Sequence, residues 1–399
     1  MLGFKKMKSL HIFMAGLFLF SVCNLVWAED STGFHFNNLS LSPFVNLDYT
    51  YDSNVNYDNN GAESDSILRV NPGVDFSYTG NEWGLKGSGW YSYEKYVDDG
   101  RLDAKRYGEH VEFYKETANG WKFVLGEHYL KSNQNDSLTD GGEGKWRDRD
   151  EFGVNAAVSY QMTERTSLTL SGMYSDMRYS RDPDQYYDLY GWTEWSTGLE
   201  LAHRITEKSN VLLNGQYQRY SSDGATQVSS DSTGYSLMAG LGSAATRRIS
   251  YHALTGVSWF DYANSDQLCG WTYSLDASWI ISKKWAATLA GSSYYQPSES
   301  EENQAQKVDA LSAGVTYRPM RKLTTRFDVA WRREDEEYNL SQVQAETRDL
   351  VSTRARVDYQ LMRYMTVYSS LEYQKELSDE YDSDEFNRFR GSVGLSLRY

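Results

Sequence analysis

The chain alternates short amphipathic stretches with connections of two distinct lengths. Eight short turns rich in Gly, Asn, Lys and Arg occur at residues 79–82, 117–120, 162–165, 204–209, 243–248, 281–284, 318–322 and 361–364. Nine longer polar segments lie between and around them, and the longest covers residues 131–150. Seventeen connections predict eighteen strands, with sixteen as the alternative count. A soluble β-sandwich has no reason to place short turns on one side and long loops on the other.

Within the stretches, side chains alternate with a period of two, which places successive residues on opposite faces of a strand. Residues 271–279 place Trp271, Tyr273, Leu275, Ala277 and Trp279 on one face and Thr272, Ser274, Asp276 and Ser278 on the other. The second face is too polar for a dry protein core. The first face begins and ends on aromatic residues, as at a lipid–water boundary. The pattern therefore predicts an all-β fold, a transmembrane antiparallel up-and-down β-barrel of the outer-membrane type.

One predicted strand contains a proline. Pro72 lies in the middle of residues 66–78, where a closed barrel has no free edge to tolerate a missing N–H donor. Because Gly73 follows it, the sequence predicts a local β-bulge at this point.

The last predicted strand continues to the final residue. Its apolar face consists of Phe389, Gly391, Val393, Leu395, Leu397 and Tyr399. An even number of strands places both chain ends on the short-turn side, so this strand is expected to pair with the first one, near residues 41–51. A terminal aromatic residue with alternation behind it also resembles the C-terminal signature by which bacterial outer-membrane proteins are recognised. Phe389, Val393, Leu395, Leu397 and Tyr399 are the residues that carry this assembly signature.

The N-terminus has the features of a secretory signal. Lys5, Lys6 and Lys8 precede an apolar run that ends near Val26 and Ala28. We expect a cleaved signal peptide at 1–28, a short periplasmic tail at 29–40 and a single barrel domain at 41–399. Cleavage would move the formal charge from -15 to -18 through the loss of three lysines, and would leave Cys269 without a partner for a disulfide. The predicted location is the bacterial outer membrane.

An enzymatic function is not expected. The histidines form no His-x-Ser or Asp-x-His pair that would place two catalytic partners on one face of a strand. His110 and His128 occur in two copies of "GEH" on either side of the 117–120 turn, so they are expected to face each other across the ladder in the lumen. Two ligands without a third make a poor metal site, and an ordinary lumen pair is the preferred interpretation. No phosphate loop, CxxC pair or calcium loop is present, so no cofactor is expected.

Arginines gather on the polar face of the late strands. By alternation, Arg326, Arg332, Arg354, Arg356, Arg388, Arg390 and Arg398 should face the lumen, and Asp328, Asp358 and Glu372 share that wall. Arginine binds carboxylate or phosphate through paired hydrogen bonds, so this wall could pass an anionic solute. The alternative, favoured here, is that opposite charges on neighbouring strands stabilise one another.

The stretch "PFVNLDYTYDSNV" at residues 43–55 resembles the opening of the β-barrel porin 2 family, whose members include outer-membrane proteins encoded beside exopolysaccharide genes. Three functions remain open: a passive porin for small solutes, a dedicated exporter of exopolysaccharide, and a structural or adhesive barrel with a closed lumen. The expected partners are outer-membrane lipid, lipopolysaccharide and the outer-membrane assembly machinery. An exporter would also need periplasmic polysaccharide-export partners, and no nucleic-acid partner is expected.

Overall fold

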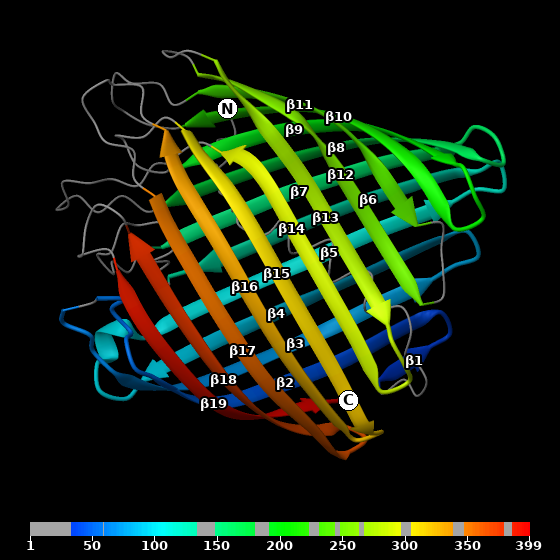
Figure 1. The fold of residues 1–399 in the computed structure, drawn as a ribbon. Helices are drawn as coiled ribbons and strands as arrows, with labels where there is room; N and C mark the ends of the chain where they lie inside the picture. The colour runs from blue at the N-terminus through cyan, green and yellow to red at the C-terminus, as the bar shows by residue number, and fades with distance from the viewer. Residues whose placement is uncertain are drawn as a thin grey trace, which may run out of the picture.

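A computed structural model describes residues 33–58, 60–133, 148–179, 191–222, 231–243, 248–262, 267–296, 305–337, 347–378 and 385–399. These residues form one antiparallel sheet that curls into a barrel of tilted strands (Figure 1). The strands are β1 (Phe34–Phe36), β2 (Leu39–Asp52), β3 (Asp65–Thr79), β4 (Trp83–Tyr96), β5 (Ala104–Glu116), β6 (Trp121–Ser132), β7 (Arg149–Gln161), β8 (Thr166–Tyr179), β9 (Trp192–Arg204), β10 (Ser209–Ser222), β11 (Ser232–Ser243), β12 (Ile249–Tyr262), β13 (Leu268–Ile280), β14 (Trp285–Gln296), β15 (Ala305–Met320), β16 (Leu323–Glu337), β17 (Thr347–Met362), β18 (Met365–Ser378) and β19 (Phe386–Arg398). A short 3-10 turn, η1 (Gly100–Leu102), lies between β4 and β5. None of the described helical segments is long and apolar enough to span a membrane.

The barrel wall consists of the eighteen strands β2 to β19, each paired with its neighbours in chain order. The circle closes where β19 pairs with β2, from Arg390 opposite Asp52 to Arg398 opposite Phe44. This confirms the predicted eighteen strands and the predicted pairing of last with first, and it sets the sixteen-strand count aside. β2 begins at Leu39, slightly before the expected start. Closure leaves the wall without an exposed edge.

The two ends of the barrel differ in their connections. We use "short-turn end" for the end where β19 finishes and where tight turns such as 117–120 lie. We use "long-loop end" for the opposite end, where the connections 53–64 and 97–103 lie. Residues 1–32, which include the expected signal peptide, and part of the long segments lie outside the described residues, and the signal peptide stays a prediction.

The outer face of the barrel is apolar. On β13, Trp271 and Trp279 are strongly exposed, and Leu275 between them lies opposite Ala253 and Gly291 on the same face. Cross-strand partners share a face, so the period-two pattern of each strand continues around the barrel. A closed wall with an apolar outside satisfies its backbone groups internally and matches lipid. The fold is therefore that of an outer-membrane β-barrel.

Pro72 does not form the predicted bulge. Its pairing with Val45 of β2 keeps the register of the surrounding residues, and β3 meets β4 in one register on both sides of it, at Val70 opposite Tyr93 and Gly73 opposite Trp90. Only the pairs of Asn71 and Pro72 with β4 are missing, and these are the pairs that need the N–H that proline lacks. The strand thus omits one hydrogen bond instead of inserting a residue. Gly73 makes room for an aromatic ring, because a Cβ there would lie 2.3 Å from Cζ of Phe44.

β1 extends the closure of the barrel beyond the end of β19. β19 pairs with β2 only as far as Phe44, and β1 pairs with the preceding residues Leu39 to Leu41. The backbone N–H of Tyr399 donates to the carbonyl of Pro43 at 3.0 Å. The Tyr399 ring packs on Phe34, with 4.9 Å between the ring centroids. β1 and Tyr399 together therefore cover the edge of β2 at the short-turn end.

Of the three buried apolar clusters that the described residues form inside the barrel, two lie at the long-loop end. Met177, Trp192, Tyr220 and Phe260 belong to one buried cluster near that end of their strands. Val55 of the first loop packs with Ile67 and Tyr96, the inward residues next to the same end of β3 and β4. These clusters narrow the interior on the long-loop side, next to the charged residues described below.

Candidate functional site: a charged wall inside the barrel

The centre of the wall is the seam between the last and first strands. Arg388 and Arg390 of β19 both bind the carboxylate of Asp52 at the end of β2. The Nε atom of Arg388 donates to Oδ1 of Asp52 at 2.9 Å, and Nε of Arg390 donates to Oδ2 at 2.8 Å. Asp52 and Arg388 are almost completely buried. Because an isolated buried charge is costly, this geometry fixes both arginines against the seam.

A second chain of charges continues from the seam across β3, β4 and β5. Arg69 donates from Nε to Oε1 of Glu94 at 2.8 Å and from Nη1 to Oδ1 of Asp48 at 3.4 Å. Arg106 donates from Nη2 to the same Oε1 of Glu94 at 2.8 Å. The two guanidinium groups therefore lie side by side around one carboxylate oxygen.

The structure places the seven predicted arginines on the inward face, and each has an acidic neighbour. The ion pairs are Arg326–Asp328, Arg332–Glu334, Arg354–Glu372, Arg356–Asp358, Arg388–Asp52, Arg390–Asp52 and Arg398–Asp75. Asp328, Arg354, Glu372, Arg390 and Asp52 also face one another in turn across β16, β17, β18, β19 and β2. Charges of alternating sign thus cross the seam in register, as the favoured interpretation of the sequence requires. Their role as a functional site stays a prediction.

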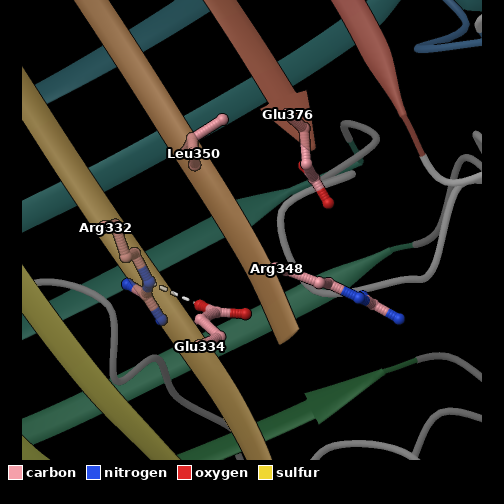
Figure 2. Close-up of a pocket in the computed structure, with 5 residues that line it drawn as sticks. All are labelled: Arg332, Glu334, Arg348, Leu350 and Glu376. Carbon is pink, nitrogen blue, oxygen red and sulfur yellow. Dashed lines mark hydrogen bonds and ion pairs between the residues drawn. The ribbon is translucent and has the colours of Figure 1, made fainter. Parts of the chain in front are cut away.

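A recess opens beside this wall on β16, β17 and β18. Arg332, Glu334, Arg348, Leu350 and Glu376 line about 300 Å³ of empty space that includes open solvent. Figure 2 shows Arg332 and Glu334 joined on one strand, with the Arg348 and Glu376 side chains extending from the neighbouring strands. Glu334 also accepts a hydrogen bond from Nε2 of Gln306 at 2.8 Å. The recess is therefore lined chiefly by paired charges.

His110 and His128 face each other across β5 and β6, as the sequence predicts. The turn between them has Gly120 in the left-handed region at φ 82°. His128 lies 3.7 Å from Oε1 of Glu151, and its ring occupies the space above Gly153. Within the described ranges, no group of three or more His, Cys, Asp or Glu residues is placed to hold a metal ion.

The first loop folds over the seam at the long-loop end. The Nδ2 of Asn54 donates to the carbonyls of Asp58 and Asn387, and the Tyr57 ring covers the Arg388 guanidinium at 4.0 Å from its centroid. Tyr57 adopts φ 55°, a left-handed conformation that is rare for a bulky residue and is maintained by surrounding contacts. The loop thus packs against Arg388, the arginine that also binds Asp52.

The next long-loop connection is ordered by carboxylates. Asp65 accepts the backbone N–H groups of Val97, Asp98 and Asp99. Asp103 accepts from Lys95 Nζ at 2.8 Å, from the Tyr96 N–H and from the Tyr93 hydroxyl. Burial opposes ionisation of Asp103, but these hydrogen bonds outweigh it and lower its pKa. Hydrogen bonds from Arg101 lower the pKa of Asp99 to about 2.

Sequence reasoning missed part of the charged wall. Asp48, Asp52, Arg69, Glu94 and Arg106 were not identified, although all five are on the polar faces of their strands. Three of the late ion pairs did carry a sequence signal, because Arg-x-Asp or Arg-x-Glu places both partners on one face two residues apart. The pairs at the seam carry no such signal, since they join residues more than 300 positions apart.

A family model described as "Putative MetA-pathway of phenol degradation" matches residues 195–345, which is less than half of the chain. It is a different family from the β-barrel porin 2 family that the first strand resembles, and that resemblance stays a prediction. No curated protein matches the chain in sequence.

Several solved barrels resemble the structure. The siderophore receptor PirA from Acinetobacter baumannii is 8% identical, with 93% of this chain and 81% of that chain covered and a TM-score of 0.49. OccAB3 from Acinetobacter baumannii is 9% identical, with 91% and 100% covered and a TM-score of 0.44. OpdK from Pseudomonas aeruginosa, solved with vanillate, is 11% identical, with 90% and 99% covered and a TM-score of 0.46.

Proposed function

We propose that the protein is a porin-like channel of the outer membrane through which small polar solutes pass passively. The observation that carries the proposal is the exposure of inward arginines. The Arg326, Arg354 and Arg398 side chains are 50%, 50% and 53% exposed, although they face the inside of a closed barrel. Arg354 lies in the middle of β17, away from both rims, so its side chain is exposed to space within the lumen. This exposure supports an interior that is open to water beside β17, as a channel requires.

The polar lining supports the same proposal. Charged side chains paired inside the barrel need no dry packing partner and can be solvated by lumen water. Transport through such a channel needs no catalytic group and no cofactor. The exporter and adhesive alternatives draw no comparable support from the described residues or from the similar proteins.

Conductance of the refolded barrel in a planar lipid bilayer tests this proposal. We expect stepwise insertion events with an ohmic current in potassium chloride. Permanently silent insertions of folded, heat-modifiable protein would contradict the channel and would favour the closed-lumen alternative. Recovery of the protein in the outer-membrane fraction of a Gram-negative host tests the location separately.

A further inference from the structure

We infer that Arg69, Arg106 and Arg390 form a binding site for small oxyanions, carboxylates or phosphates, on the lumen wall near the long-loop end. The inference deepens the proposed channel function and rests on it, because a solute would reach these groups through the lumen. It names the chemical class of solute that the channel would favour.

The three arginines meet from separate strands. Arg69 on β3 and Arg106 on β5 share Oε1 of Glu94, each at 2.8 Å. Arg390 on β19 binds Asp52 on β2, and Asp52 faces Asp65 on β3, two inward positions from Arg69. The fold therefore gathers three guanidinium groups from three strands on one part of the wall.

Their acidic partners lie behind them. The Arg390, Arg106 and Arg69 side chains are 24%, 26% and 32% exposed. The side chains of Asp52, Glu94 and Asp48 are only 0%, 1% and 7% exposed. The carboxylates are thus sealed against the wall, whereas part of each arginine side chain is open to the lumen. A solute at this level would meet the three arginines, and Glu372, which faces Arg390 on β18, is the acid exposed beside them at 23%.

The arginines retain donors for a ligand. A guanidinium group carries five N–H donors. Arg390 uses only Nε, Arg106 only Nη2, and Arg69 uses Nε and Nη1 in hydrogen bonds to described residues. At least one Nη group of each therefore has no hydrogen-bond partner in the described part of the chain. Two such groups can bind the two oxygens of a carboxylate or phosphate.

Two further acids nearby are already engaged. Glu372, which lies opposite Arg390 on β18, forms an ion pair with Arg354 at 4.0 Å. Asp65 accepts backbone N–H groups of residues 97–99 at the rim. Neither is bound to the three arginines, so neither removes their donors.

Other inward arginines provide a contrast. In Arg326–Asp328 the two side chains are 50% and 30% exposed, and in Arg356–Asp358 they are 34% and 28% exposed. Both signs of charge are accessible there, so these pairs present no net positive surface to the lumen. They serve as matched controls on the same inner face.

The test compares Arg390→Lys and the triple variant R69Q/R106Q/R390Q with the control R326Q/R356Q. Folded barrel in detergent is heated in inorganic phosphate or acetate, against chloride at equal ionic strength. We expect phosphate, and acetate more weakly, to raise the unfolding temperature of the unchanged protein and of the control. Arg390→Lys keeps a positive charge beside Asp52 but loses the planar guanidinium group with its paired N–H donors. The phosphate affinity of this variant should therefore fall on the order of tenfold. Arg390→Lys alone still tests the site if the triple variant fails to fold.

Bilayer recordings then separate the two proposals. In a channel that conducts, phosphate should reduce chloride current in the unchanged protein and in the control but not in Arg390→Lys. A conducting barrel that phosphate neither stabilises nor blocks would overturn the anion site and leave the channel function intact. A silent barrel that phosphate stabilises through these arginines would overturn the channel function and support the site. Equal phosphate effects in Arg390→Lys and the unchanged protein would overturn the site.

Discussion

Arg388 and Asp52 form a buried ion pair across the seam of the barrel, although they lie 336 positions apart in the chain. Asp52 is the last residue of the first barrel strand, and Arg388 is near the start of the last strand. The pair therefore forms only when the barrel has closed. It joins the two chain-terminal strands where the first loop also packs, through Tyr57.

Removing this carboxylate should destabilise the barrel strongly. Asp52→Asn leaves Arg388 buried without its counter-charge, and breaking such a pair costs about 3–5 kcal/mol. Asp75→Asn is the matched control, because it breaks the pair with Arg398 where both partners are well exposed. That change should cost less than about 1 kcal/mol. Urea-dependent folding into lipid vesicles measures both, and equal costs would contradict the role of the seam pair.

The two faces of β13 should respond differently to charge. Leu275 faces lipid midway between Trp271 and Trp279, so Leu275→Arg should cost about 2–4 kcal/mol. Ser274→Arg places the same side chain inside the barrel and should be mild. The free energy of unfolding from lipid vesicles decides this, and a similar loss in both variants would show that the faces are wrongly assigned.

The C-terminal residues should be needed for closure. Deleting Leu397 to Tyr399 removes the pairing with Val45 and Phe44 and the ring contact with Phe34. We expect little heat-modifiable barrel in the outer membrane and degraded or aggregated chain in the periplasm. Phe34→Ala, which removes only the ring contact, should still assemble. Normal amounts of folded barrel from the deletion variant would refute the prediction.

Tyr57 should hold the first loop on the seam. Tyr57→Ala loses the ring over Arg388, a contact worth about 1–2 kcal/mol where water is excluded. Tyr57→Phe keeps the ring and should behave like the unchanged protein. Limited proteolysis of the folded barrel at residues 53–64 measures the difference. Equal cleavage of the Ala and Phe variants would show that the ring does not fix the loop.

The connection 97–103 should loosen in acid. Folding lowers the pKa of Asp103 below the usual aspartate value of 3.8, chiefly through hydrogen bonds that outweigh its desolvation. Its stabilising contribution is therefore complete above that usual value and is lost as the pH falls through the lower, folded value. Pepsin cleavage within 97–103 should increase from pH 4 to pH 2, when corrected for pepsin activity on an unfolded substrate. Asp103→Asn should remove most of this increase, and an unchanged pH dependence in that variant would contradict the assignment.

The periodicity of the sequence was enough to predict the barrel. Alternation in segments such as 271–279 decides which residues face lipid, because a strand points successive side chains to opposite faces whatever its neighbours are. The turn lengths predicted eighteen strands, and Gly120 marked the turn that brings His110 opposite His128. These features are local, so they can be read from neighbouring residues. The predicted bulge at Pro72 was wrong because a missing N–H can be tolerated as one absent hydrogen bond, without a change of register.

Only the tertiary structure decided which charges meet. Alternation places Asp52, Arg69, Glu94 and Arg106 inside the barrel. Asp52 meets its arginines across strands that are distant in the chain, and Arg106 meets Glu94 across the 97–103 connection. Only Arg69 meets Glu94 across a hairpin with a short turn. The sequence also could not predict which of these acidic side chains are buried. Asp52 lies sealed behind Arg388 and Arg390 at the seam, and Glu94 behind Arg69 and Arg106, whereas Asp328 stays accessible to the lumen. Side-chain direction follows from local backbone geometry, whereas ion pairing and solvent access depend on how the closed barrel brings distant strands together.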